Sequence, residues 1–301
     1  MSIRPVKSIM QAQPTLEGAG VKLHRAFGFG ETGEYDPFLL FDDFRNENPA
    51  DYLAGFPWHP HRGIETITYV LAGTVNHNDS LGNQGALGAG DVQWMTAGSG
   101  ILHQEMPKGN PQGRMHGFQL WANLPSSMKM TNPRYQDVPS GEIPEEIDND
   151  GTKVRVICGD FWGKKGPVEG IAADPRYLDI WVPPGKRKTL PVESSRHAFA
   201  YIFEGSGTFR DASKPFGILT EQQGPVETLV REQTGNRSLI LFDSGDEITM
   251  QAGDKGIRFL LVSGKPIEEP VAWYGPIVMN TQAELRQALS DLNEGTFIKH
   301  R

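Results

Sequence analysis

The chain has 301 residues, 38% of them hydrophobic and 22% charged, so it is long enough for two ordinary domains and needs no disulfide to stabilise its core. Its formal net charge of -8 argues against a direct nucleic-acid partner, because such a partner is bound mainly through its phosphates. With Cys158 as the one cysteine, no secretory signal and no run of about 20 apolar residues, we expect a cytoplasmic protein without a membrane segment.

Short runs of β-branched and aromatic residues recur along the chain, and each ends at Gly, Pro or Asp. The chain contains 35 Gly and 22 Pro, which agrees with many tight turns. Such a pattern predicts an all-β sandwich or barrel. The predicted strands, in chain order, are residues 66–71, 155–158, 178–182, 199–203, 239–242 and 257–262.

The last predicted element is a helix near the C terminus. Thr281 and Glu284 fit a capping box, in which the hydroxyl and the carboxylate bind free backbone N–H groups of the first turn. The apolar residues that follow fall on one helical face. These residues are Leu285, Ala288, Leu289 and Leu292.

A faint internal repeat suggests two related β domains. The sequence YVLAGT at 69–74 resembles YIFEGS at 201–206, and a Gly-Asp turn follows in each half. Residues 136–152 are acidic and rich in Pro and Gly, which favours a linker. We therefore predict an N-terminal domain at 1–135 and a C-terminal domain at 153–301 that includes the helix.

The first cluster of candidate ligands is His59-Pro60-His61. Successive side chains on a strand point to opposite faces, so imidazoles at i and i+2 face the same way. Pro60 lacks a backbone donor, which suits an edge or the start of a strand. The two histidines can therefore bind one metal ion together.

The second cluster, His103-Gln104-Glu105, has the same spacing. Two strands with two ligands each could close a site made of His59, His61, His103 and Glu105. Three imidazoles and a carboxylate, without thiolate, suit Fe, Mn, Co, Ni, Cu or Zn rather than Ca. Four protein ligands leave two octahedral positions open, which favours catalysis over a structural role.

Several nearby residues leave alternatives open. Glu65 also has even spacing from the first histidine pair, so it could bind the metal or support a ligand. His116 could orient a ligand or simply pack in the core. Trp58 and Trp94 are candidates for the mouth of the site, although burial in the core is the favoured interpretation for both.

The two clusters resemble the metal-binding stretches of pirins, which belong to the cupin superfamily. The resemblance lies in GFPWHPHRGIETITYVLAG at 55–73 and GDVQWMTAGSGILHQEMP at 90–107, and it extends to residues 37–44, 115–125 and 264–281. It implies two jelly-roll β-barrel cupin domains face to face, with the metal only in the N-terminal one. General cupins take a glutamate from the first stretch, here Glu65, whereas pirins take it from the second, here Glu105.

The resemblance also implies a function. Some pirins are similar to quercetin 2,3-dioxygenase, so the leading hypothesis is an enzyme that opens a flavonol ring with O2 and releases CO. Glu105 would then accept the proton of the flavonol 3-hydroxyl. Fe2+ is the metal that we expect, with Mn, Co, Ni, Cu and Zn as alternatives.

A second hypothesis is a regulatory protein without enzymatic activity. By the same resemblance, the metal or its redox state would control contact with a protein partner, either in transcription or on a metabolic enzyme. The acidic chain favours protein over DNA as that partner. The resemblance suggests a monomer.

Overall fold

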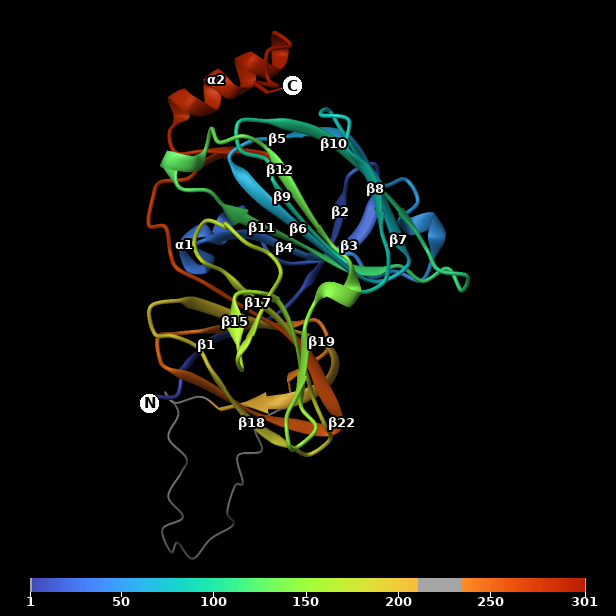
Figure 1. Ribbon diagram of the computed structural model, residues 1–301, viewed down its shortest axis with the longest axis vertical. Coiled ribbons are helices and arrows are strands. Elements are labelled where there is room, and N and C mark those ends of the chain that lie inside the picture. The colour runs from blue at the N-terminus through green and yellow to red at the C-terminus, as the bar shows by residue number, and fades with distance from the viewer. Residues whose placement is uncertain (1, 211–233, 301) are drawn as a thin grey trace, which may run out of the picture. The chain divides into compact units, whose positions relative to one another are not determined.

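The computed structural model describes residues 2–210 and 234–300 and consists mainly of β-strands, with a C-terminal helix (Figure 1). The predicted fold class, two β domains of cupin type with a short C-terminal helix, is confirmed. By their contacts, the described residues divide into two compact units, each built from three stretches of chain. The larger unit is Ala12–Pro144, Val156–Arg176 and Gly264–Arg301, and the smaller unit is Met1–Gln11, Glu145–Arg155 and Tyr177–Ser263.

The units overlap with the ranges 1–135, 136–152 and 153–301 without coinciding with them. Residues near the N terminus pair within the smaller unit, and the last stretch, Gly264–Arg301, packs in the larger one. Part of the expected linker is a strand, β13 (Glu145–Ile147), which pairs with β14 (Lys153–Cys158). Sequence composition does not reveal these unit boundaries, because they are set by pairing between segments that lie far apart in the chain.

Two antiparallel sheets make up most of the larger unit. The first has the order β12 (Arg134–Val138), β9 (Val92–Thr96), β6 (Ile64–Ala72), β11 (His116–Asn123), β4 (Phe38–Asp43), β3 (Val21–Phe27) and β2 (Gln13–Glu17). The second has the order β5 (Phe56–His61), β10 (Ile101–Lys108), β7 (Thr74–Asp79) and β8 (Gln84–Leu87). Two small hairpins add β15 (Asp160–Phe161) with β16 (Lys164–Lys165), and β23 (Ala272–Tyr274) with β24 (Ile277–Met279).

One large sheet forms most of the smaller unit. Its path is β1 (Val6–Gln11), β21 (Ser238–Phe242), β19 (His197–Phe209), β22 (Glu247–Gly264), β17 (Arg176–Val182), β14 and β13, with β18 (Arg187–Pro191) on β22 and β20 (Thr234–Gly235) on β19. The short helices are η1 (Phe29–Glu31), α1 (Thr32–Tyr35), η2 (Pro49–Asp51), η3 (Ser126–Met128) and η4 (Ser140–Glu142). The six strands predicted from sequence all lie within observed strands, namely β6, β14, β17, β19, β21 and β22.

Strand β6 shows why the β-branched run at 66–71 forms a central strand. It lies between β9 and β11, and its first seven residues are all buried, Thr66 and Thr68 included. Gly73, which follows it, has φ +83°, and a Cβ there would lie 2.7 Å from a backbone oxygen. Gly205 in the related strand β19 has φ +70° and is also crowded by backbone atoms, so the repeat marks a glycine in the left-handed region in each half, between strands at Gly73 and within a strand at Gly205.

The predicted helix is α2 (Gln282–Asn293), and its capping box at Thr281 and Glu284 is present. Leu285 and Ala288 pack with Phe297 and residues of β23 and β24 in one apolar cluster of the larger unit. Cys158 is buried. Of the described residues, no helix combines the length and the apolar character needed to cross a membrane.

Candidate metal centre

Strands β5 and β10 pair antiparallel at the edge of the four-stranded sheet, and they carry the histidines. His103 lies directly opposite His59. Two residues on, Glu105 pairs with Phe56, so β5 contains one extra residue and bulges. As an edge strand, β5 also tolerates Pro60, which has no N–H to donate.

The three histidine side chains converge on one point. Nε2 of His59 lies 3.0 Å from Nε2 of His61 and 2.9 Å from Nε2 of His103. Among the described residues these are the side chains whose donor atoms group closely enough to hold a metal ion, all within 4.8 Å of one another. His61 and His103 are each 1% exposed.

The surroundings favour neutral imidazoles with their Nε2 lone pairs directed inward. Nδ1 of His59 lies 2.7 Å from the carbonyl oxygen of Pro57, which fixes the proton on Nδ1 and leaves a lone pair on Nε2. Burial lowers the pKa of His59, and it lowers the pKa of His61 and His103 further, with the neighbouring imidazoles adding to the effect. Two other imidazoles approach this one lone pair, an arrangement that a shared cation satisfies better than a hydrogen bond does.

Glu105 lies beside the three histidines but outside their close group. Its Oε2 is 4.0 Å from Nε2 of His103, and its Oε1 accepts a hydrogen bond of 3.1 Å from Oγ1 of Thr68. Burial raises the pKa of Glu105 to about 7, which the bond from Thr68 only partly offsets. The carboxyl can therefore gain or lose a proton close to neutral pH.

Glu65 points away from this centre. A turn at Gly63, with φ +76°, separates β5 from β6 and breaks the even spacing seen in the sequence. Glu65 is three residues from Thr68 on β6 and so faces the opposite side of the sheet. It accepts a hydrogen bond of 2.7 Å from Thr96, and burial raises its pKa to about 7.

The other histidines and tryptophans near the site lie in different surroundings. His116 begins β11 with its ring against Phe118, at 5.3 Å between centroids. His77, to which the sequence assigned no partner group, lies opposite Glu105 on β7 with its Nε2 3.0 Å from Nε2 of Gln93. Trp94 is fully buried, whereas Trp58 is 52% exposed and lines the cavity described next.

A cavity of about 840 Å³ in the larger unit begins at the histidines. Much of its wall is aromatic. Phe29 stacks on Trp273 at 4.1 Å between centroids, and Trp121 stands edge-on to both Phe29 and His61. The aromatic wall residues are Phe29, Phe44, Tyr52, Phe56, Trp58, Trp121 and Trp273.

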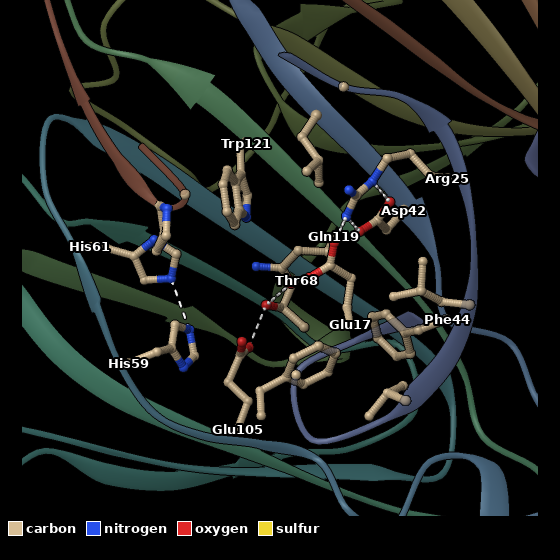
Figure 2. A pocket seen from close by; sticks show the side chains of 18 of the residues that line it. Glu17, Arg25, Asp42, Phe44, His59, His61, Thr68, Glu105, Gln119 and Trp121 are labelled. Atoms are coloured by element: carbon tan, nitrogen blue, oxygen red, sulfur yellow. Dashed lines mark hydrogen bonds and ion pairs between the residues drawn. The ribbon is translucent and has the colours of Figure 1, made fainter. Parts of the chain in front are cut away.

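A row of polar side chains crosses the cavity side of the seven-stranded sheet (Figure 2). Strand register places Arg25 opposite Asp42, and Asp42 opposite Gln119. Gln119 in turn lies opposite Thr68, whose Oγ1 is 2.7 Å from the Gln119 side-chain oxygen. Since Thr68 also bonds Glu105, the row runs from the histidines to the ion pair of Arg25 and Asp42.

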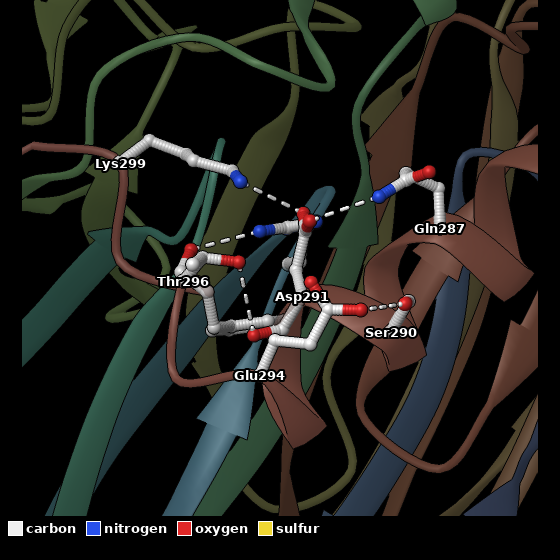
Figure 3. A network of polar contacts seen from close by, with 8 residues as sticks. Gln287, Ser290, Asp291, Glu294, Thr296 and Lys299 are labelled. Carbon is white, nitrogen blue, oxygen red and sulfur yellow. Dashed lines mark hydrogen bonds and ion pairs between the residues drawn. The ribbon is translucent and has the colours of Figure 1, made fainter.

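The C-terminal segment supports the end of β5 that carries His61. Arg62, which follows His61, donates to Oδ2 of Asp291 and to the carbonyl of Phe297, both at 2.8 Å. Asp291 also accepts a hydrogen bond from Gln287 and forms an ion pair with Lys299 (Figure 3). The Arg62 backbone N–H also donates to the carbonyl of Pro276, and the Val278 N–H donates to the carbonyl of Arg62.

Sequence reasoning missed the polar row because its members lie on four strands far apart in the chain. No short motif contains Thr68 with Gln119, or Arg25 with Asp42. One weak signal is a charged or polar residue within an otherwise apolar strand, as in Asp42 within FLLFDD. Such a residue is buried only when it has a polar or charged partner. The sheet register is needed to identify that partner.

The chain is similar to known proteins over nearly its full length. Residues 20–122 match the family model for pirin, and residues 177–298 match the model for the pirin C-terminal cupin domain. A pirin-like protein of Caulobacter vibrioides is 42% identical over 298 residues, covering 99% of this chain and 100% of that protein. A Pseudomonas aeruginosa protein, provisionally named a quercetin 2,3-dioxygenase, is 40% identical and covers 97% of each chain. The crystal structure of quercetin 2,3-dioxygenase from Acinetobacter baumannii is 30% identical, with TM-score 0.84, covering 98% of this chain and 99% of that one.

Proposed function

The chain belongs to the pirin family, and from this premise we propose that it is a mononuclear metal enzyme that cleaves flavonols in the manner of quercetin 2,3-dioxygenase. The observation that carries the proposal is the convergence of three imidazole nitrogens, two of them from buried histidines, at the wall of an aromatic cavity. Similarity to proteins named for that activity supports the choice of reaction.

The donor set fits a divalent transition metal. His59, His61 and His103 would hold it through Nε2, and Glu105 would complete the set with a modest side-chain movement. Neutral imidazoles with a carboxylate and no thiolate suit Fe2+, which we expect, and also Mn, Co, Ni, Cu or Zn. When bound, the metal would supply neighbouring coordination positions for the flavonol oxygens and for O2.

Glu105 is the base in this proposal. A flavonol whose 3-hydroxyl lies at the histidines has that hydroxyl within reach of the Glu105 carboxylate. The proton passes from the hydroxyl oxygen to Glu105, and Thr68 keeps the carboxylate oriented through its hydrogen bond. Burial raises the pKa of Glu105, and a bound cation would favour the ionised carboxylate that accepts this proton.

The cavity walls would hold the flat ring system and exclude water. Trp121 and Phe29 offer aromatic surfaces next to His61, and Trp273 continues the wall toward the exposed side. Planar aromatic rings gain dispersion and stacking energy from such surfaces. Exclusion of water protects the deprotonated substrate until O2 reacts and the ring opens with release of CO.

The test is O2 uptake and CO release when quercetin is added to protein loaded with Fe2+. We expect equal moles of O2 consumed and CO released, with both signals lost in His61→Ala. The exposed His300 provides a matched control, since His300→Ala should retain full activity. Bound metal without O2 uptake would reject the enzyme and favour a metal-dependent regulatory protein.

A further inference from the structure

We propose that Glu17, Arg25 and Asp42 form a second subsite of the cavity, which binds the hydroxyl groups of an uncharged, hydroxylated aromatic ring. This inference rests on the proposed function, because the histidines hold the other end of the same substrate. All three residues line the cavity that reaches the histidines (Figure 2). The subsite would select among flavonols.

The spacing of the sheet sets the distance between the two ends. Thr68, which contacts Glu105, lies on β6, and Arg25 lies on β3, with β11 and β4 between them. Three strand spacings amount to at most about 14 Å. The 3-hydroxyl lies on the central ring of a flavonol, so the outer ring extends from the histidines over part of this span, and the long side chains of Glu17 and Arg25, which both line the cavity, cover the rest.

The three side chains keep hydrogen-bonding capacity for a ligand. Arg25 donates from Nε and Nη2 to the two oxygens of Asp42, both at 2.8 Å, and from Nη2 to Oε1 of Glu17 at 2.8 Å. Within the part of the chain that the structure describes, Arg25 Nη1 and Glu17 Oε2 have no hydrogen-bond partner. A phenolic hydroxyl both donates and accepts, so it matches this pair of atoms.

The charge of the group argues for hydroxyls rather than carboxylates. One guanidinium and two carboxylates leave a formal charge of -1 when both acids are ionised. A ligand carboxylate would meet this like charge in a partly buried site, at a cost in binding free energy. Neutral donors gain from the same carboxylates, because hydrogen bonds to charged groups are stronger than neutral ones.

The experiment measures dissociation constants under anaerobic conditions, so that bound flavonol is not consumed. Quercetin, kaempferol and galangin share the 3-hydroxyl and carbonyl and carry two, one and no hydroxyls on the outer ring. Quenching of tryptophan fluorescence in the metal-loaded protein reports binding. We expect the dissociation constant to fall up to about tenfold for each hydroxyl, the effect of one hydrogen bond to a charged partner.

Two variants test the residues. In Asp42→Asn and in Glu17→Gln the differences among the three ligands should shrink to under about twofold, with galangin affinity little changed. Glu17 is partly exposed, so its variant is the safer of the two for folding. The matched control is Asp179→Asn, which alters the same bidentate Arg–Asp pair with Arg258, at 2.9 and 2.7 Å, away from the cavity.

Each result decides a different claim. Equal affinity of the wild type for all three flavonols, or an unchanged ranking in both variants, would overturn the subsite while leaving the proposed function in place. Failure of every flavonol to bind the metal-loaded wild type would overturn the proposed function itself. A ranking that Asp179→Asn retains and the two subsite variants lose is the result that we expect.

Discussion

At the residue scale, the proposed chemistry depends on four side chains from two short motifs. The sequence predicted His59, His61, His103 and Glu105, because i, i+2 spacing on a strand implies a shared face. The three imidazoles do meet in the structure, whereas Glu105 lies slightly apart, with Thr68 holding one oxygen. That hydroxyl could not be predicted, because it comes from a strand of the other sheet.

Glu105→Gln separates proton transfer from metal binding. The amide cannot accept the substrate proton, so we expect kcat to fall by about 10²- to 10⁴-fold while the three histidines still hold metal. In the wild type, kcat/KM should rise with pH as Glu105 loses its proton. Because a bound cation favours the carboxylate, that rise should centre at or below pH 7. Full turnover in the variant would contradict the role of Glu105 as base.

Glu65→Gln tests the alternative glutamate through stability. Burial raises the pKa of Glu65 to about 7, so the folded protein holds this proton more tightly than the unfolded chain does. Wild-type stability therefore falls as pH rises from about 4.3 to 7, by up to about 3 kcal/mol. The variant lacks this loss, so its gain over the wild type should grow between pH 5 and pH 8 in urea unfolding. The metal content of the variant should equal that of the wild type, and loss of metal in the variant would indicate that Glu65 is a metal ligand.

At the element scale, strand β5 is held on two sides. Pairing with β10 aligns the histidines, and Arg62 fixes the end of β5 to the C-terminal segment. The strands and the capping box of α2 were predictable because local patterns determine them. The contact of α2 with Arg62, which follows β5, was not, since nothing in the sequence around Asp291 identifies Arg62 as its partner.

Asp291→Asn should weaken this attachment. Burial opposes ionisation of Asp291, but hydrogen bonds from Arg62, Lys299 and Gln287 lower its pKa to about 2. The stabilisation of the folded state by the ionised Asp291 carboxylate is thus complete above about pH 4 and is lost as pH falls through about 2. At pH 7 we expect a loss of about 3 kcal/mol in unfolding free energy of the larger unit, because Arg62 keeps a buried charge without its partner.

A matched control lies on the same helix. Ser290→Ala removes the exposed hydrogen bond from Ser290 to Glu294 and should change the unfolding free energy by no more than about 0.5 kcal/mol. Equal effects of the two substitutions would show that the Arg62–Asp291 pair contributes little. The Asp291 variant should also lose metal faster on dialysis, since β5 carries two of the histidines.

At the scale of the whole molecule, each end of the chain completes the unit formed mainly by the other half. Strand β1 pairs with β21 in the smaller unit, and Gly264–Arg301 belongs to the larger one. The internal repeat predicted two β domains, but repeats carry no information on which unit receives the ends. The pairing of strands that lie far apart in the chain determines which unit each end joins.

Because Gly264–Arg301 belongs to the larger unit, the behaviour of an N-terminal fragment can be predicted. Residues 1–135 contain all the proposed ligands but lack β23, β24 and α2, which cover β5 and contribute Asp291. We expect the fragment to bind metal at least tenfold more weakly than the full chain does, as measured by competition with a chelator. A soluble fragment with full metal affinity would show that the C-terminal segment is dispensable for the site.

The measurement that tests the central claim most directly is the metal content of protein purified without oxygen. We expect one transition-metal ion per chain in the wild type and in His300→Ala, and less than a tenth of that in His61→Ala and His103→Ala. Metal retained at full stoichiometry after either of the last two substitutions would contradict a centre built on these three histidines.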